Sequence, residues 1–133
     1  MSKTFSGVLA VGGLLLAAIP ALAHHAVQSQ FDFEKPVEVT GVLTKVEWIN
    51  PHAYLHFDVK DATGKVKNWD FETIGPAGLR KAGFSREGGF TVGDTYKVRG
   101  FAAKDGTDLA FATGVIFKDG RNVTIWFGDP NAK

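Results

Sequence analysis

Residues 53–73 read AYLHFDVKDATGKVKNWDFET, and they give the clearest indication of the fold class. Apolar and polar side chains alternate on both sides of residues 61–64, which is typical of two half-buried strands joined by a turn. A three-residue loop over 62–64 ends with Gly64 in the left-handed conformation that glycine adopts at low cost. Residue 61 then pairs with residue 65, and the register of the whole hairpin follows.

This register predicts one apolar face and one polar face. On the polar face, His56 falls opposite Asp70 and Tyr54 falls opposite Glu72. A slip of one residue would move apolar side chains to the polar face, so the turn and the apolar pattern favour the same register. The opposed pairs expected on the core face are Phe57 with Trp69 and Leu55 with Phe71.

Turn residues recur about every ten positions in the rest of the chain, which favours β structure. Pro76 at a first turn and Gly83 after the last one predict a short helix between them. Gly41 lies inside the first expected strand and indicates a bulge or sharp bend. The other strands are expected over 37–49, 95–102, 109–117 and 123–127.

This order of elements predicts an all-β fold. The closest architecture is a small OB-fold-like barrel of five to six strands, with one short helix between the third and fourth strands. A small β-sandwich or an open roll would use the same strands with a different closure. Both remain alternatives at this point.

The first residues have the pattern of a cleaved secretory signal peptide. Lys3 precedes an uncharged apolar run over 7–19, and Ala21 and Ala23 provide small residues before a cleavage site. The run is short for a membrane span, although an uncleaved anchor is the alternative. The expected organisation is a signal peptide at 1–23, an N-terminal arm at 24–36, a barrel at 37–127 and a flexible tail at 128–133, exported to the bacterial periplasm.

Composition excludes several classes of function. The chain has 15 Lys plus Arg and 14 Asp plus Glu, and loss of Lys3 with the leader would bring the charge to zero. A neutral chain lacks the basic surface that nucleic acid requires. No cysteine is present and the one methionine is Met1, so we expect neither a disulfide, a thiol nucleophile nor a soft Cu(I) site.

Cleavage after Ala23 would make His24 the first residue of the mature chain. A terminal histidine offers its α-amino group and Nδ1 to one metal ion, and borderline divalent ions favour nitrogen ligands. Cu(II) is therefore the first candidate and Zn(II) the second. His25 adds a neighbouring imidazole. The alternative is a solvated chain start without a ligand.

A second histidine pair, His52 and His56, shares one face of the expected strand with Tyr54. Residues four apart in a strand lie roughly 13 Å apart, so both rings reach one ion only if the strand bends. Pro51 could cause such a bend; otherwise only one of the two is a ligand. Hydrogen-bonded surface histidines are the alternative.

Asp70 and Glu72 are expected on the same face as these histidines. They could accept a hydrogen bond from an imidazole and fix its tautomer, or bind a metal directly. An ordinary solvated face with cross-strand pairs is the alternative. Trp48, Asn50 and Tyr54 form a second candidate, a small-ligand surface at the strand junction, although aromatic residues also serve simply as packing.

The chain resembles a family of small secreted bacterial proteins, the domain-of-unknown-function family 6152. The resemblance rests on AHH at 23–25, VEWINPHA at 46–53, WDFE at 69–72 and PAGLRKAGF at 76–84. It implies export and a small β-rich domain, and it brings no established activity. The positions that match the family's motifs are His24, His25, Trp48, Asn50, Pro51, His52, Trp69 and Glu72.

Three hypotheses follow from these residues. The first is a periplasmic protein that binds Cu(II), or Zn(II), through His24 and His52, with assistance from His25 or His56. The second is a binding module without a metal, for a small ligand or a protein partner. The third is a metal-assisted hydrolase or oxidase, which nothing in the sequence requires.

Overall fold

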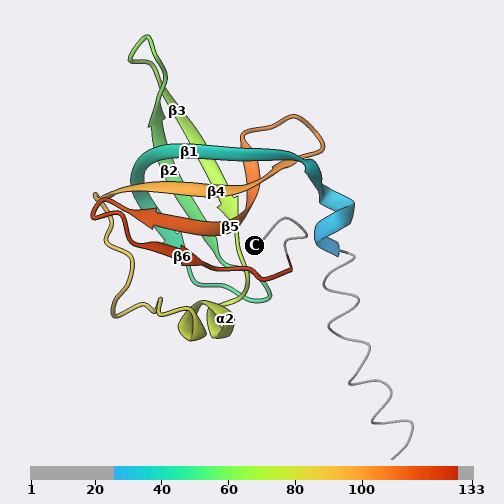
Figure 1. Ribbon diagram of the computed structural model, residues 1–133, viewed down its shortest axis with the longest axis vertical. Helices are drawn as coiled ribbons and strands as arrows, with labels where there is room; N and C mark the ends of the chain where they lie inside the picture. The colour runs from blue at the N-terminus through green and yellow to red at the C-terminus, as the bar shows by residue number, and fades with distance from the viewer. Residues whose placement is uncertain (1–25, 129–133) are drawn as a thin grey trace, which may run out of the picture.

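The computed structural model describes residues 26–128. The expected leader, His24, His25 and the tail from residue 129 lie outside this range. Six strands and one short helix between β3 and β4 confirm the predicted all-β class (Figure 1). Residues 26–30 are helical and lead into the first strand. The elements are β1 (Phe31–Glu47), β2 (Tyr54–Lys60), β3 (Val66–Glu72), α2 (Pro76–Lys81), β4 (Thr95–Ala103), β5 (Leu109–Phe117) and β6 (Asn122–Thr124).

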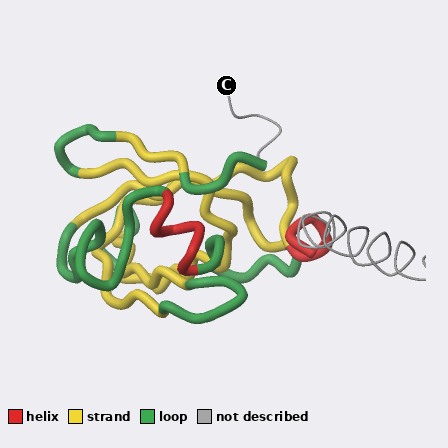
Figure 2. The backbone as a smooth tube through the Cα atoms, turned by 90° about the horizontal axis from the view of Figure 1, so that it is seen from below, coloured by secondary structure: helices red, strands yellow, loops and turns green. Residues whose placement is uncertain are grey.

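The strands form one sheet in the order β3-β2-β1-β4-β5-β6, with an additional pairing between β3 and β5. The β3–β5 pairing is parallel, and the other pairings are antiparallel. Each strand from β1 to β5 is therefore hydrogen-bonded to two or more others. Helix α2 lies across one end of the strands (Figures 1 and 2), while the β2–β3 hairpin projects at the other (Figure 1).

The predicted register of the β2–β3 hairpin is confirmed. The Asp61 amide donates to the Lys65 carbonyl at 2.9 Å, and Gly64 has a φ of +84°. The cross-strand pairs are those expected from the sequence: Tyr54 with Glu72, Leu55 with Phe71, His56 with Asp70 and Phe57 with Trp69. The core face is also correct, since Leu55, Phe57 and Phe71 are fully buried and Trp69 packs against them.

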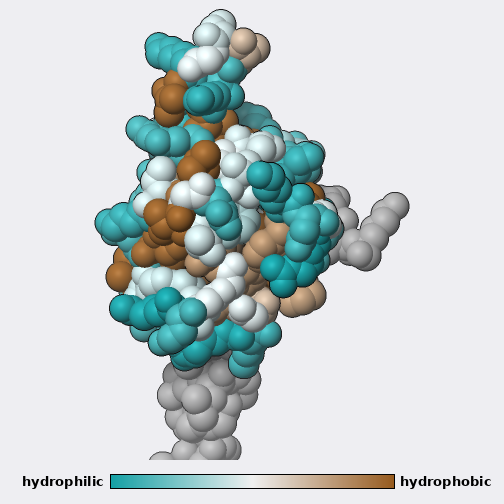
Figure 3. Space-filling view, turned by 90° about the vertical axis from the view of Figure 1, so that its left-hand side faces the viewer, coloured by the Kyte–Doolittle hydropathy of each residue, from teal (hydrophilic) through white to brown (hydrophobic). Residues whose placement is uncertain are grey.

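Buried side chains form two clusters. The larger one includes Leu43, Leu55, Phe57, Phe71, Leu79, Val98 and Val115. The smaller one contains Val27, Phe31, Phe101, Ala103 and Phe111, and it joins the start of the described chain to β4 and β5. The surface seen in Figure 3 is largely hydrophilic, with smaller apolar patches between the polar side chains.

Strand β1 differs from its predicted form in two ways. It begins at Phe31 rather than at residue 37, because Phe31 is buried and pairs with Ala103 of β4, and it ends at Glu47 rather than at residue 49. The irregularity in its pairing with β2 lies between Leu43 and Lys45, not at Gly41. Gly41 instead permits close approach, since a Cβ there would lie 2.8 Å from the carbonyl oxygen of Asp58.

Candidate functional site

The loop between β1 and β2 carries the first half of the site. It contains a cis peptide bond between Asn50 and Pro51, and His52 follows, two residues before β2 begins. The Thr73 amide donates to the Ala53 carbonyl at 2.8 Å, and the Ala53 amide donates to the Ile74 carbonyl at 3.3 Å. These bonds fix the loop to the chain that leaves β3, immediately after Glu72.

His52 and Glu72 form a partly buried pair. Nδ1 of His52 donates to a carboxylate oxygen of Glu72, and Glu72 is only 6% exposed. With the proton on Nδ1, the neutral ring keeps a lone pair on Nε2. No side chain within residues 26–128 forms a hydrogen bond with that nitrogen. A carboxylate that orients an imidazole in this way is typical of metal-binding histidines.

The ring of Phe111, in β5, packs against the ring of His52. The two ring centroids are 6.2 Å apart in an edge-to-face arrangement. Phe111 also contacts Phe31 at 5.5 Å between ring centroids, and both belong to the smaller buried cluster together with Val27. The start of the described chain and His52 therefore contact the same aromatic side chain.

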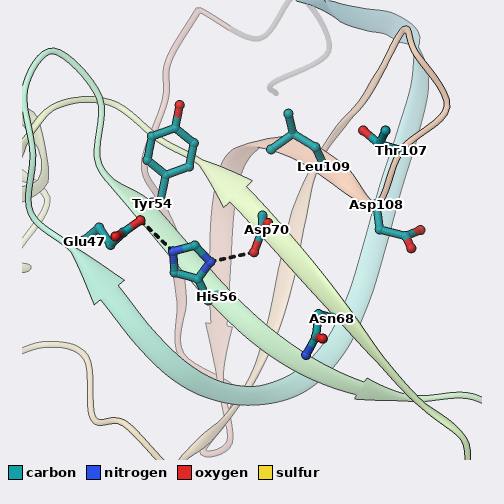
Figure 4. Close-up of a pocket in the computed structure, with 8 residues that line it drawn as sticks. All are labelled: Glu47, Tyr54, His56, Asn68, Asp70, Thr107, Asp108 and Leu109. Atoms are coloured by element: carbon teal, nitrogen blue, oxygen red, sulfur yellow. Dashed lines mark hydrogen bonds and ion pairs between the residues drawn. The ribbon is translucent and has the colours of Figure 1, made fainter.

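His56 is placed differently from His52. Its Nδ1 donates to Asp70 at 2.6 Å and its Nε2 donates to Glu47 at 2.9 Å, as Figure 4 shows. Both nitrogens donate together only when the ring is protonated, and then neither offers a lone pair to a metal. The hydrogen bond from Lys45, followed by that from His56, lowers the pKa of Glu47. His56 thus joins β1, β2 and β3.

An open hollow with a volume of about 490 Å³ lies next to His56. The ring of Tyr54 stacks loosely on that of His56, with 6.5 Å between their centroids. The side chains around the hollow come from β1, β2, β3, the chain between β4 and β5, and the first residue of β5 (Figure 4). They are Glu47, Tyr54, His56, Asn68, Asp70, Thr107, Asp108 and Leu109.

Tyr54 is expected to retain its phenol proton to a higher pH than an ordinary tyrosine. Burial is the largest cause of its raised pKa, and the charge of Glu72 adds to it. Folding favours the protonated form of the Tyr54 phenol. The contribution of this group to the free energy of unfolding is therefore complete below the ordinary pKa of 10.0, and it is lost as the pH rises through the raised pKa.

Glu72→Gln removes the charge and leaves the burial, so Tyr54 should lose its proton at a lower pH in this variant. The chain has two tyrosines, so the difference in phenolate absorbance between each protein and its Tyr54→Phe counterpart isolates this group. An identical titration of Tyr54 in the unmodified protein and in the Glu72→Gln variant would contradict the assignment.

The three residues of the candidate ligand surface, Trp48, Asn50 and Tyr54, do not line one common surface in the structure. Tyr54 lines the hollow, whereas Trp48 is half-buried and packs against Phe90, with 6.4 Å between ring centroids. Asn50 is exposed in the junction loop. Trp48 and Asn50 are not among the side chains that line the hollow.

Two side chains at the site did not emerge from the sequence. Glu47 pairs with Tyr54 across β1 and β2, and Phe111 reaches His52 from β5. Their positions depend on pairings between distant strands and on the bulge in β1. Local alternation of polar and apolar residues carries no signal for either contact.

The described residues do not contain a complete metal centre. Within 26–128, no group of three or more His, Cys, Asp or Glu side chains is arranged to hold an ion. The expected ligands His24 and His25 lie outside this range. In the same range, no helix combines the length and apolar character needed to cross a membrane.

Comparison with known families identifies the chain. Residues 11–112 match the family of unknown function DUF6152. The chain belongs to this family. The DUF6152 match includes His52, Glu72 and the hairpin that carries His56, and it ends within β5. Comparisons with curated proteins and with solved structures gave no significant match.

Proposed function

We propose that this DUF6152 protein is exported to the periplasm and binds one divalent transition-metal ion through His24 and His52. Cu(II) is the first candidate and Zn(II) the second, because the ligands are nitrogens and the chain after residue 23 contains neither cysteine nor methionine. His24, as the first residue after cleavage at Ala23, would supply its α-amino group and its imidazole. His25 would assist.

The pairing of His52 with Glu72 is the observation that carries this proposal. A buried carboxylate that accepts from Nδ1 fixes the tautomer in which Nε2 is the ligand atom. It also raises the basicity of the ring toward a metal. His56, with both nitrogens donating to carboxylates, is assigned to holding the strands together rather than to the ion.

The position of the chain start supports the partnership between His24 and His52. Residues 26–31 lead into the cluster around Phe111, on which the His52 ring also rests. Val27 belongs to this cluster, and three residues of chain can span at most about 10 Å, so the position of Val27 supports an approach of His24 to His52.

We also propose an OB-fold-like barrel as the architecture. The pairings β1–β2, β2–β3, β3–β5, β5–β4 and β4–β1 form a continuous circuit, and α2 lies between β3 and β4 in the chain. Both features support that topology. β6 would then be an addition at the end of β5.

A titration of the protein that begins at His24 tests the metal proposal. The expected result is saturation at one equivalent of Cu(II), with an EPR spectrum that contains nitrogen hyperfine couplings. Competition with Zn(II) should give a weaker complex at the same site, in line with the usual order of divalent metal affinities. A Cu(II) spectrum without nitrogen ligands would overturn the proposal.

The open hollow favours a second candidate, a binding module for a small molecule or a protein partner without a metal. Tyr54 and the carboxylates around it provide apolar contact and hydrogen-bond acceptors in one concave surface. Under this alternative, Tyr54→Ala would abolish ligand binding, whereas changes to His24 and His52 would leave it intact.

A further inference from the structure

Gly75, at the start of α2, lies against the loop that carries His52. A Cβ at position 75 would be 2.5 Å from the carbonyl oxygen of Pro51 and 3.6 Å from Oδ1 of Asn50. The nearest obstacle is therefore backbone, which cannot rotate away as a flexible side chain can. Any side chain at this position requires a shift of backbone, either in this loop or at the start of α2.

Backbone conformation gives no reason for glycine here. Gly75 has φ −67° and ψ 168°, which is extended backbone that other residues adopt readily. It is also the N-cap of α2, a position that favours Ser, Thr, Asp or Asn because their side chains bond the first free amides. The helix would gain from such a residue, so the close approach to Pro51 is what requires glycine.

The same contact bears on His52, which directly follows Pro51. The backbone bonds of Ala53 to residues 73 and 74 hold the chain after this imidazole, and the Pro51 carbonyl before it lies close to Gly75. Glu72, which accepts from Nδ1 of His52, lies at the end of β3 in the same connection. Displacement of the Pro51 carbonyl would thus move the ring relative to its carboxylate.

We infer that Gly75 is a positioning residue for His52: its missing side chain lets the Pro51 carbonyl approach and so sets the imidazole against Glu72. The metal-binding consequence rests on the proposed function, whereas the contact between His52 and Glu72 can be measured in the metal-free protein. Gly75 itself touches no proposed ligand atom.

The test compares Gly75→Ala with Gly88→Ala, a glycine of the following loop at which a Cβ would meet nothing within 4 Å. In the metal-free protein, NMR of imidazole protons reports the Nδ1–H of His52 and that of His56 separately. Gly75→Ala should shift or broaden the His52 signal and leave that of His56. Gly88→Ala should leave both unchanged.

Cu(II) titration of the same proteins provides the second readout. Gly75→Ala should bind Cu(II) at least about tenfold more weakly than the unmodified chain. A loss of this size is at the lower end of those typical for residues that support a metal ligand. A folded Gly75→Ala protein with an unchanged His52 signal would overturn the inference. Absence of Cu(II) binding by the unmodified chain would overturn the proposed function, while the NMR comparison would still decide the role of Gly75.

If Gly75→Ala fails to fold, a double variant with Pro51→Gly decides the question. Glycine at 51 frees the loop to move away from the new side chain, so folding should return. The His52 signal should still differ from that of the unmodified protein. The loop then avoids the new side chain by moving away, and the imidazole does not return to its original position. Recovery of both the original His52 signal and the original Cu(II) affinity in the double variant would contradict the inference.

Discussion

Replacing His52 with asparagine is expected to lower the affinity for Cu(II) by more than about 100-fold, beyond the loss usual for a supporting residue. The change removes Nε2, the nitrogen that the proposed site offers to the ion. His56→Asn should leave the affinity within a few-fold of the unmodified chain, because both nitrogens of His56 already donate to carboxylates. EPR titration of the two variants measures this contrast.

Asparagine is chosen because its Nδ2 takes the place of Nδ1. At position 52 it can still donate to Glu72, so the buried carboxylate keeps a partner and the fold is not burdened with an unpaired charge. At position 56 it can still donate to Asp70 while the bond to Glu47 is lost. Equal loss of Cu(II) binding in both variants, or full binding by His52→Asn, would refute the assignment of roles.

Phe71→Ala should destabilise the protein by about 3–5 kcal/mol, the cost typical of removing a buried aromatic ring. Phe71 is fully buried and pairs with Leu55 of β2 and with Ala110 of β5. Its ring lies 5.9 Å from that of Phe57 and 6.0 Å from that of Trp69, measured between centroids. It therefore anchors β3 to both neighbouring strands.

Val66→Ala is the matched control on the same strand, since Val66 is 48% exposed. Its cost should stay within about 0.5 kcal/mol, as for most surface changes. The free energy of unfolding in urea measures both variants. A small loss for Phe71→Ala, comparable with that of the control, would show that the β3–β5 contact does not hold the core.

The β2–β3 hairpin was predictable from the sequence because its signals are local. Alternation over 53–59 and 66–73 determines the faces, and the turn ending at Gly64 determines the register. Pro76 and Gly83 similarly limit the helix to one short segment. Strand β5, expected over 109–117, has those bounds in the structure.

The pairing between strands that lie far apart in the sequence was harder to predict. The N-terminal part of β1 contains charged residues and Pro36, which interrupt the apolar pattern, although Phe31 is buried by its contact with β4 and β5. The bulge after Leu43 changes which residues of β1 oppose β2. Neither feature follows from the spacing of residues along the chain.

The candidate site, too, was predictable only in part. The register predicted Asp70 opposite His56, and that pairing is confirmed. Glu72 was expected on the same face, either solvated, bound to a metal or bonded to a histidine, and in the structure it accepts from His52. The different roles proposed for the two histidines depend on Glu47, which reaches His56 only because of the β1–β2 pairing. The spacing of residues along the chain does not separate His52 from His56 in this respect.

The most direct test of the proposed metal site compares two proteins that differ by one residue. One begins at His24, and the other carries an additional alanine before it, which leaves every described residue unchanged but removes the α-amino group from His24. EPR during Cu(II) titration should show a nitrogen-coordinated species at one equivalent for the first protein, with much weaker binding and altered couplings for the second. Identical spectra and affinities for the two proteins would contradict the proposed site.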